Sequence, residues 1–306
     1  MKPPTFTPYD GSSRPFTIGV RPIDAADWIA PCDHLLAMLA EKDRLNRDLP
    51  REVYVEEAGT QGAQRELLDL LVAHLIECHP ATHRREGDAM IVAGDRRVDL
   101  ADANRAALRV AADLVADDIV LMRRGDDGWR LAAASLCFPS SWTLSEKFGK
   151  PLQRIHDPVP GFGEGTRTAE IIQRMFDNFQ PGQTAIRWNW SLQSDMALYK
   201  PLSDEQRDVR ALARPPRFPG GAASAFIRVE RQTLRKLPAS GDIVFTIRID
   251  LDPMAALARH PDGARLAASL AAQLSALDAA QMDYKGFNAD RDRLVADLGR
   301  IAAPLA

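Results

Sequence analysis

The sequence has few cysteines and no long apolar run. Its 306 residues contain three cysteines, Cys32, Cys78 and Cys137, and no Cys-x-x-Cys pair. Three widely spaced cysteines argue against a disulfide framework, a zinc cluster and a cysteine-ligated iron–sulfur cluster. No run of about 18 apolar residues is present, which predicts no membrane span, and the N-terminus lacks the apolar core of a signal peptide. We therefore expect a cytoplasmic protein with reduced thiols.

A strong excess of charge and the common nucleotide and hydrolase motifs are also missing. The formal net charge of −3 argues against a nucleic-acid partner. The chain contains no Gly-x-Ser-x-Gly, no P-loop and no Gly-x-Gly-x-x-Gly motif. The glycine-rich stretch "GFGEG" at 161–165 lacks the strand that precedes a phosphate-binding loop, so we interpret it as an ordinary loop.

Hydrophobic periodicity predicts helices at both ends of the chain and strands between them. We expect one domain over residues 1–306, with a helical part at 1–118, a sheet core at 119–252 and helices at 253–306. The core begins with two strands, "IVLMRR" and "WRLAAASLCFP", joined by the turn "GDDG". Short helices follow, and then "TAIRWNWSLQ", "FIRVERQTLRKL" and "IVFTIRIDLD" predict three more strands. This element order predicts an α+β fold with a PAS-like, antiparallel five-stranded sheet.

Alternation within the last three strands separates charged side chains from apolar ones. Arg187 and Asn189 alternate with tryptophans, Arg228 and Glu230 alternate with aliphatic residues, and Arg248 and Asp250 do the same in the last strand. A solvated face with cross-strand ion pairs and a covered cavity for a polar ligand both fit this pattern. Arg231 lies on the opposite face from Glu230 in a regular strand, so the two share no pocket unless a bulge intervenes.

The stretch "LQRIHDPVPGF" at 152–162 holds one histidine, His156, at the end of a predicted short helical turn. A neutral imidazole on a rigid segment is a common metal or haem ligand, although a lone histidine is more often a local hydrogen-bonding residue. No second histidine or Cys-x-x-Cys pair supports a zinc site. Cys137 is the rival haem ligand, but its apolar strand disfavours a thiolate. The apolar residues expected around a haem are Phe148, Ile155, Phe162, Ile172, Met175, Phe176 and the tryptophans of the next strand.

Several stretches together resemble the haem-dependent oxidative N-demethylase family, long catalogued as a domain of unknown function. They are "SSWTLSEKFGKPLQRIHDPVPGF", "RWNW" and "FIRVERQTLRKLP", and the opening "PFTIGVRPIDAADWI" and the late "MDYKG" are similar too. The resemblance implies a PAS-like fold that binds haem b through a histidine and demethylates a small alkylamine, such as dimethylamine, with O2. It also implies electrons from NADPH through FMN and 2Fe-2S centres, which we expect on a separate reductase partner.

The same resemblance, taken with the strand faces, suggests roles for individual residues. His156 would ligate the haem iron, with Asp157 or a backbone carbonyl orienting its other ring nitrogen. Glu230 would bind the cationic amine, and Arg228 is assigned with it to the catalytic group. The candidates for cofactor contact are Arg187, Arg231 and Trp190, and Arg187, Arg228 and Arg231 are natural partners for the haem propionates.

Two other functions remain open at this point. A non-enzymatic haem PAS protein could sense a gas or a redox state, and a haem-free interaction domain would have a merely solvated polar face. Absorbance separates the haem-free domain from the haem proteins, and formaldehyde release in the presence of a reductase separates an enzyme from a sensor.

Overall fold

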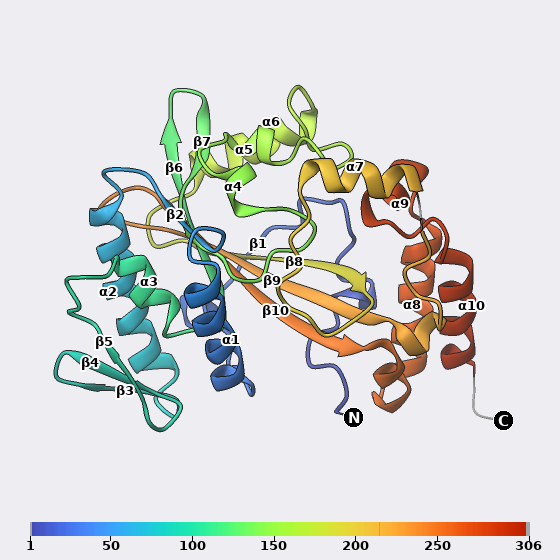
Figure 1. Ribbon diagram of the computed structural model, residues 1–306, viewed down its shortest axis with the longest axis horizontal. Helices are drawn as coiled ribbons and strands as arrows, with labels where there is room; N and C mark the ends of the chain where they lie inside the picture. Colours follow the sequence, from blue (N-terminus) through green and yellow to red (C-terminus); the bar gives the residue numbers. More distant parts are fainter. Residues whose placement is uncertain (1, 214, 304–306) are drawn as a thin grey trace.

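The computed structural model describes residues 2–213 and 215–303 and is centred on an antiparallel sheet (Figure 1). The strands lie in the order β1-β8-β9-β10-β6-β7-β2. The prediction of an antiparallel sheet is confirmed, but the sheet has seven strands rather than five, because two short strands from the N-terminal part extend its edges. The bounds are β1 Arg21–Pro22, β2 Tyr54–Glu56, β6 Asp118–Gly125, β7 Gly128–Ser135, β8 Thr184–Gln193, β9 Phe226–Lys236 and β10 Ile243–Pro253.

The N-terminal part is not wholly helical, which corrects the prediction for residues 1–118. Its helices are α1 Leu35–Asp48, α2 Gln61–Cys78 and α3 Ala107–Ala112, with 3-10 turns η1 Pro8–Asp10 and η2 Ala25–Asp27. A separate three-stranded sheet, β3 His83–Glu86, β4 Ala89–Val92 and β5 Arg96–Asp99, lies between α2 and α3 in the chain. Each of these strands has only four residues, which is too short for a clear alternation pattern.

Four helices lie between β7 and β9: α4 Leu144–Lys147, α5 Leu152–Ile155, α6 Arg167–Asn178 and α7 Asp204–Ala213. Thr143 Oγ1 donates to Glu146 Oε2 at 2.6 Å at the start of α4, and Thr166 caps α6 by accepting from the backbone N–H of Ala169. Helix α7 and η3 Gly221–Ser224 lie between β8 and β9 in the chain.

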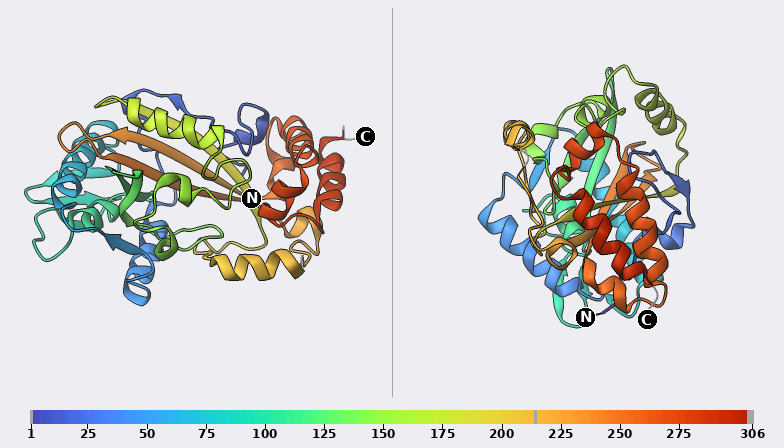
Figure 2. Two further views of the ribbon diagram at one scale, coloured as in Figure 1. Left: turned by 90° about the horizontal axis from the view of Figure 1, so that it is seen from above. Right: turned by 90° about the vertical axis from the view of Figure 1, so that its right-hand side faces the viewer.

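The C-terminal part contains η4 Met254–Arg259 and the helices α8 Gly263–Ser275, α9 Ala279–Lys285 and α10 Arg291–Ala302. Asp278 and Gln281 form a capping box at the start of α9, and Gly286 ends this helix with a φ of 67°. The N-terminal helices and the C-terminal helices lie at opposite ends of the long axis (Figures 1 and 2).

Two clusters of buried apolar residues hold the protein together. The larger cluster joins β6, β7 and β10 to α1, α2, α3 and α6, and the smaller one packs β8 and β9 against α8, α9 and α10. The strands β8–β10 therefore link the two ends of the molecule. Within the described residues, no helix combines the length and the apolarity needed to cross a lipid bilayer.

Strand register decides which side chains share a face. Arg187 pairs with Gln232, Asn189 with Glu230 and Ser191 with Arg228, so these six residues lie on one face. On β10, Ile247 and Ile249 continue this face, because they pair with Gln232 and Glu230. Arg248 pairs with Arg231 and points to the other side. The polar sides of the three strands therefore do not form one continuous polar face.

Candidate functional site

A cavity of about 400 Å³ lies against the face of the sheet that carries Arg187 and Glu230. This volume is within the range of roughly 300–1,000 Å³ that is typical of small-molecule and cofactor sites. The strands β6–β10 contribute to its walls, and side chains from α5, α6, α7, α9 and the segment 138–142 complete them. The cavity therefore combines residues 16–20, the central strands and elements from the second half of the chain, whereas α1–α3 do not line it.

One part of the cavity is apolar. Its walls contain most of the residues expected around a haem, but Phe148 and the tryptophans of β8 do not line it, and Trp142 does. The apolar lining residues from the strands and from α5–α6 are Val120, Met122, Leu131, Leu152, Ile155, Phe162, Ile172, Met175, Phe176, Leu234, Phe245 and Ile247.

His156 lies in this apolar part, at the C-terminal end of α5. Its backbone N–H donates to Leu152 O at 3.2 Å and its carbonyl accepts from Val159 N at 2.8 Å, which fixes the main chain. The imidazole contacts the ring of Phe162, with centroids 6.1 Å apart, and neither ring nitrogen makes a hydrogen bond to any residue that the structure describes. Asp157 does not orient the ring, because its Oδ1 accepts from Glu164 N at 2.9 Å.

The electrostatic surroundings keep His156 neutral. Burial, and then the positive charges of Arg187 and Lys147, lower the pKa of His156 from 6.5 to about 4. Iron is bound by the neutral imidazole, so this shift and the two free nitrogens suit a metal-ligand role.

Glu230 is the only carboxylate among the described residues that line the cavity. Its Oε2 accepts from Gln232 Nε2 at 2.9 Å and from Asn189 Nδ2 at 3.3 Å. Its Oε1 lies 3.5 Å from Nε of Arg228, and the side chain is 15% exposed. These neutral and cationic donors fix the carboxylate at the cavity wall.

Positive side chains outnumber this carboxylate. Seven of them line the cavity: Lys147, Arg187, Lys200, Arg207, Arg210, Arg217 and Lys285. Several donate to backbone carbonyls instead of carboxylates, such as Arg187 to Ile18 O at 3.0 Å and Arg217 to Lys285 O at 2.8 Å. Burial lowers the pKa of Arg187, and it lowers that of Arg217 to about 10. The cavity can therefore take a ligand with anionic groups.

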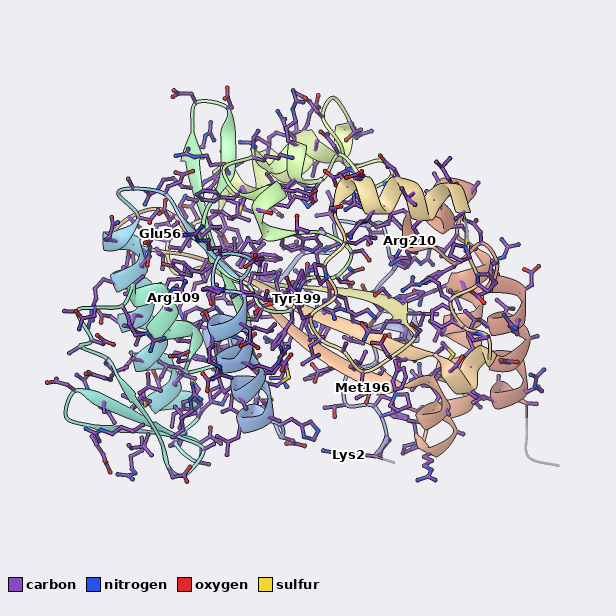
Figure 3. The ribbon with its side chains drawn as sticks, in the orientation of Figure 1. Lys2, Glu56, Arg109, Met196, Tyr199 and Arg210 are labelled. Atoms are coloured by element: carbon purple, nitrogen blue, oxygen red, sulfur yellow. The ribbon has the colours of Figure 1, made fainter. Side chains whose placement is uncertain are left out.

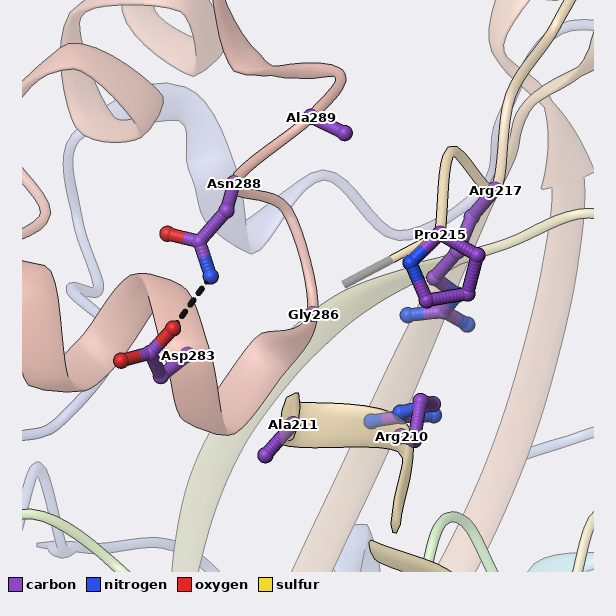
Figure 4. Close-up of a pocket in the computed structure, with 8 residues that line it drawn as sticks. All are labelled: Arg210, Ala211, Pro215, Arg217, Asp283, Gly286, Asn288 and Ala289. Atoms are coloured by element: carbon purple, nitrogen blue, oxygen red, sulfur yellow. Dashed lines mark hydrogen bonds between the residues drawn. The ribbon is translucent and has the colours of Figure 1, made fainter. Parts of the chain in front are cut away.

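Arg210 and Arg217 meet at the end of α9. Figure 3 shows Arg210 on α7, and Figure 4 shows it near Arg217 and Gly286. A Cβ on Gly286 would lie 3.3 Å from Nη2 of Arg210 and 3.5 Å from Cδ of Arg217. Beside this contact, Asn288 donates a hydrogen bond to Asp283 (Figure 4). The glycine thus allows both arginines to pack closely against the turn.

Segment 139–141 and α7 are tied together. Arg207 Nη2 donates to Ser141 O at 2.7 Å, and Ser141 N donates to Lys200 O at 2.9 Å. Ser141 has a φ of 62°, a backbone conformation that non-glycine residues rarely adopt. These bonds fix the chain where it passes the cavity.

Tyr284 and Lys285 bring the C-terminal part to the cavity. The ring of Tyr284 contacts Phe16 edge-on at 5.8 Å, and its hydroxyl makes no hydrogen bond to the described part of the chain. Burial raises the pKa of Tyr284, so the phenol stays protonated. Lys285 Nζ donates to Trp190 O at 2.8 Å.

The structure brings three of the predicted site residues together at the cavity: His156, Arg187 and Glu230. Arg228 is fully buried behind Glu230, where its Nη2 donates to Phe138 O at 2.6 Å. It lies beside Glu230, but it does not line the cavity.

The other two predicted residues lie on the opposite face of the sheet. Arg231 donates to the carbonyls of Trp28 and Asp27, and Trp190 Nε1 donates to Gln273 Oε1 at 3.0 Å. Neither lines the cavity. Cys137, the rival haem ligand, is also outside it, and burial raises the pKa of its thiol to about 12.

Sequence reasoning missed the residues that reach the cavity from α4, α7, α9 and the segment after α7. They are Lys147, Arg207, Arg210, Arg217, Tyr284 and Lys285. No periodicity singles them out, because they are polar residues spread over several short elements. The available signal was the "MDYKG" stretch, which contributes to the family resemblance and contains Tyr284 and Lys285.

The fold and the cavity together define a mixed α/β protein with a cavity of cofactor size that is apolar on one side and basic on the other. Residues 19–295 match the family described as haem-dependent oxidative N-demethylase, alpha subunit-like, and the chain belongs to this family. Membership supports an oxidoreductase function that depends on haem, which agrees with the family resemblance of the sequence.

Proposed function

We propose that this protein is a haem-dependent monooxygenase that removes a methyl group oxidatively from a small alkylamine. The observation that carries the proposal is that one cavity is lined by the neutral imidazole of His156, whose ring nitrogens make no hydrogen bond to a described residue, and by the carboxylate of Glu230. A haem needs the imidazole as its axial ligand, and a cationic amine needs the carboxylate as its counter-ion.

The residues present fit haem b. His156 would bind the iron, and the apolar walls from β6, β7, α5 and α6 would contact the macrocycle. The haem propionates need cations as partners. Of the three predicted partners, Arg187 lines the cavity, whereas Arg228 and Arg231 do not. We therefore assign the propionates to Arg187 and the other cations that line the cavity. The element order β6–β7, α4–α6, β8–β10 supports a PAS-like core around this site.

Bound haem would supply the activation of O2 with electrons from a donor. The protein residues would then bind and orient the amine. Gln232, Asn189 and Arg228 hold the Glu230 carboxylate in place for the substrate ammonium group. Hydroxylation of the N-methyl carbon gives a carbinolamine, which breaks down to formaldehyde and the shorter amine.

The electrons would come from NADPH through FMN and 2Fe-2S centres on a separate reductase. The sequence has no dinucleotide motif, and the described residues contain no group of three or more His, Cys, Asp or Glu side chains that could hold a metal. Both observations support an external electron donor.

Absorbance of the purified protein tests the haem proposal. Protein expressed with ample haem should show a Soret band, and His156→Ala should lose the haem or shift the band. His34→Ala, which removes an exposed histidine, is the control. A colourless wild-type protein would overturn the proposal.

An amine titration then separates the enzyme from a haem sensor. Methylamines should shift the spectrum of the wild-type protein and not that of Glu230→Gln. Formaldehyde release with an added reductase should follow the same pattern. A haem protein that binds no amine and releases no formaldehyde would instead be a sensor.

A further inference from the structure

Lys285 is a half-buried amine at the cavity wall that the proposed demethylation does not use. Its Nζ has one hydrogen-bond acceptor, Trp190 O at 2.8 Å, and lies 5.2 Å from the ring centroid of Phe16 and 5.3 Å from that of Trp190. No carboxylate of the described residues forms an ion pair with it. The site thus lacks the counter-ion that normally keeps a buried lysine charged.

The surroundings increase the fraction of free amine. Burial lowers the pKa of Lys285, the charge of Glu230 opposes this effect, and Arg187 and Arg217 add to it, so that the pKa falls from 10.5 to about 8. At pH 7 about a tenth of Lys285 is then unprotonated, roughly 200 times the fraction for a lysine of ordinary pKa. A neutral amine also competes less with a substrate ammonium group for Glu230.

Other lysines at the cavity are held differently. Lys200 Nζ forms an ion pair with Asp195 Oδ2 at 2.6 Å. Lys147 Nζ donates to Ile155 O at 3.0 Å, on the α4–α5 side of the cavity. Lys285 is the lysine whose electrostatic surroundings include both Glu230 and Arg187.

We propose that Lys285 is a reversible formaldehyde-binding site. The inference rests on the proposed function, because demethylation would release formaldehyde beside this amine. The nitrogen lone pair forms a bond to the aldehyde carbon, the C=O π pair moves to oxygen, and a proton passes from nitrogen to that oxygen. Hydroxide then leaves with the remaining N–H proton as water, and this loss gives the imine. No oxidant is needed, and water reverses both steps.

The two aromatic rings and the backbone carbonyl suit this role. The carbonyl of Trp190 holds Nζ at the cavity wall, and the rings of Phe16 and Trp190 lie 5.2 and 5.3 Å from it. An imine of formaldehyde adds only one carbon to the side chain, so it fits where a larger adduct would need the rings to move.

Reductive trapping tests the site without any turnover. Wild-type protein is treated briefly at pH 7 with formaldehyde and cyanoborohydride, with no amine and no reductase, and the methylated peptides are measured by mass spectrometry. We expect Lys285 to be methylated at least ten times faster than Lys200. Equal rates, or no label on Lys285, would overturn the proposal.

The pH dependence gives a second readout on the same samples. The rate at Lys285 should rise with pH and level off above about pH 8. Lys285→Arg keeps the charge and should remove the fast phase of formaldehyde uptake. If Lys285 is labelled but the protein shows no Soret band, then Lys285 binds formaldehyde and the proposed haem-dependent function is wrong.

Discussion

Gln232 holds Glu230 from two residues along the same strand. Its Nε2 donates to Glu230 Oε2 at 2.9 Å, and its Oε1 accepts from Arg187 Nη1 at 2.7 Å. Because residues two apart share a face of a strand, one amide joins the carboxylate to the guanidinium. The relative position of the two charged groups therefore depends on Gln232.

Gln232→Leu should weaken amine binding. Glu230 loses its shortest hydrogen bond and Arg187 loses an acceptor, and a hydrogen bond to a charged group contributes about 2 kcal/mol. We expect a loss of affinity of about tenfold or more in the amine titration of the haem-loaded protein. Ser191→Ala, which changes a cavity-lining residue of the neighbouring strand β8, should leave the dissociation constant of the amine unchanged. Equal affinities for wild type and Gln232→Leu would contradict this role.

Arg228→Met should destabilise the fold strongly. The side chain is 0% exposed, and its loss leaves Phe138 O without this donor and Glu230 without its cation. Breaking a buried pair costs about 3 kcal/mol or more, measurable as a lower urea midpoint. Arg228→Lys should recover part of the loss, because it keeps the charge without the planar donors.

The matched control is Arg265→Met, since Arg265 is 58% exposed and forms an ion pair with Asp262 one turn away. Exposed pairs contribute about 0–1 kcal/mol, so the midpoint should hardly change. If both variants lost the same stability, Arg228 would have no special structural role.

The His156 imidazole should make the haem-free protein sensitive to acid. Its pKa is lowered from 6.5 to about 4 on folding, so between these values the unfolded state binds more protons than the folded state. Stability contributed by the neutral ring is present above pH 6.5 and is lost as the pH falls toward 4. From pH 7 to pH 5 the loss amounts to at most about 2 kcal/mol.

Urea unfolding of the haem-free protein at these two pH values measures the effect. His156→Gln should lose less stability than wild type over the same step. His74, whose pKa is also lowered to about 4 by burial, remains in the variant and leaves some acid sensitivity. Identical slopes for the two proteins would mean that His156 titrates normally.

Gly286→Ala should disturb both the fold and the ligand site. The residue has a φ of 67°, and its Cβ would approach Nη2 of Arg210. We expect a loss of about 1 kcal/mol from the backbone and faster transfer of haem to an acceptor protein, because Arg210 and Arg217 must move.

Gly241→Ala isolates the backbone effect. Gly241 has a φ of 74° with nothing within 4 Å of a new Cβ. This variant should lose similar stability and keep the haem transfer rate of wild type. If Gly286→Ala also kept that rate, the contact with the two arginines would not matter for the ligand.

The sequence was most informative where local patterns decide the structure. The "GDDG" turn joins β6 to β7 as predicted, with Gly125 opposite Gly128. Pro151 precedes the first residue of α5, and the helix ends at His156 because the Asp157-Pro158 step disfavours a helical continuation. Alternation alone placed Arg231 on the other face of β9 from Glu230, and the strand has no bulge there.

The parts that were missed depend on contacts between distant residues. Strand β1 has two residues and becomes a strand only through its pairing with β8. Helix α7 has no buried residue, so it shows no core-facing periodicity. The basic side of the cavity combines residues from α4, α7 and α9, and no spacing in the sequence indicates that these helices meet.

The two kinds of wall around the cavity have different mechanical properties. One side is a continuous hydrogen-bonded sheet, whereas the other includes short helices such as α7, which is held by the bonds from Arg207 to Ser141 and from Asp204 N to Glu146. A rigid, plate-shaped molecule cannot pass between paired strands. We therefore expect haem to enter on the helical side, and the rate of cofactor loading would report on how readily those helices move.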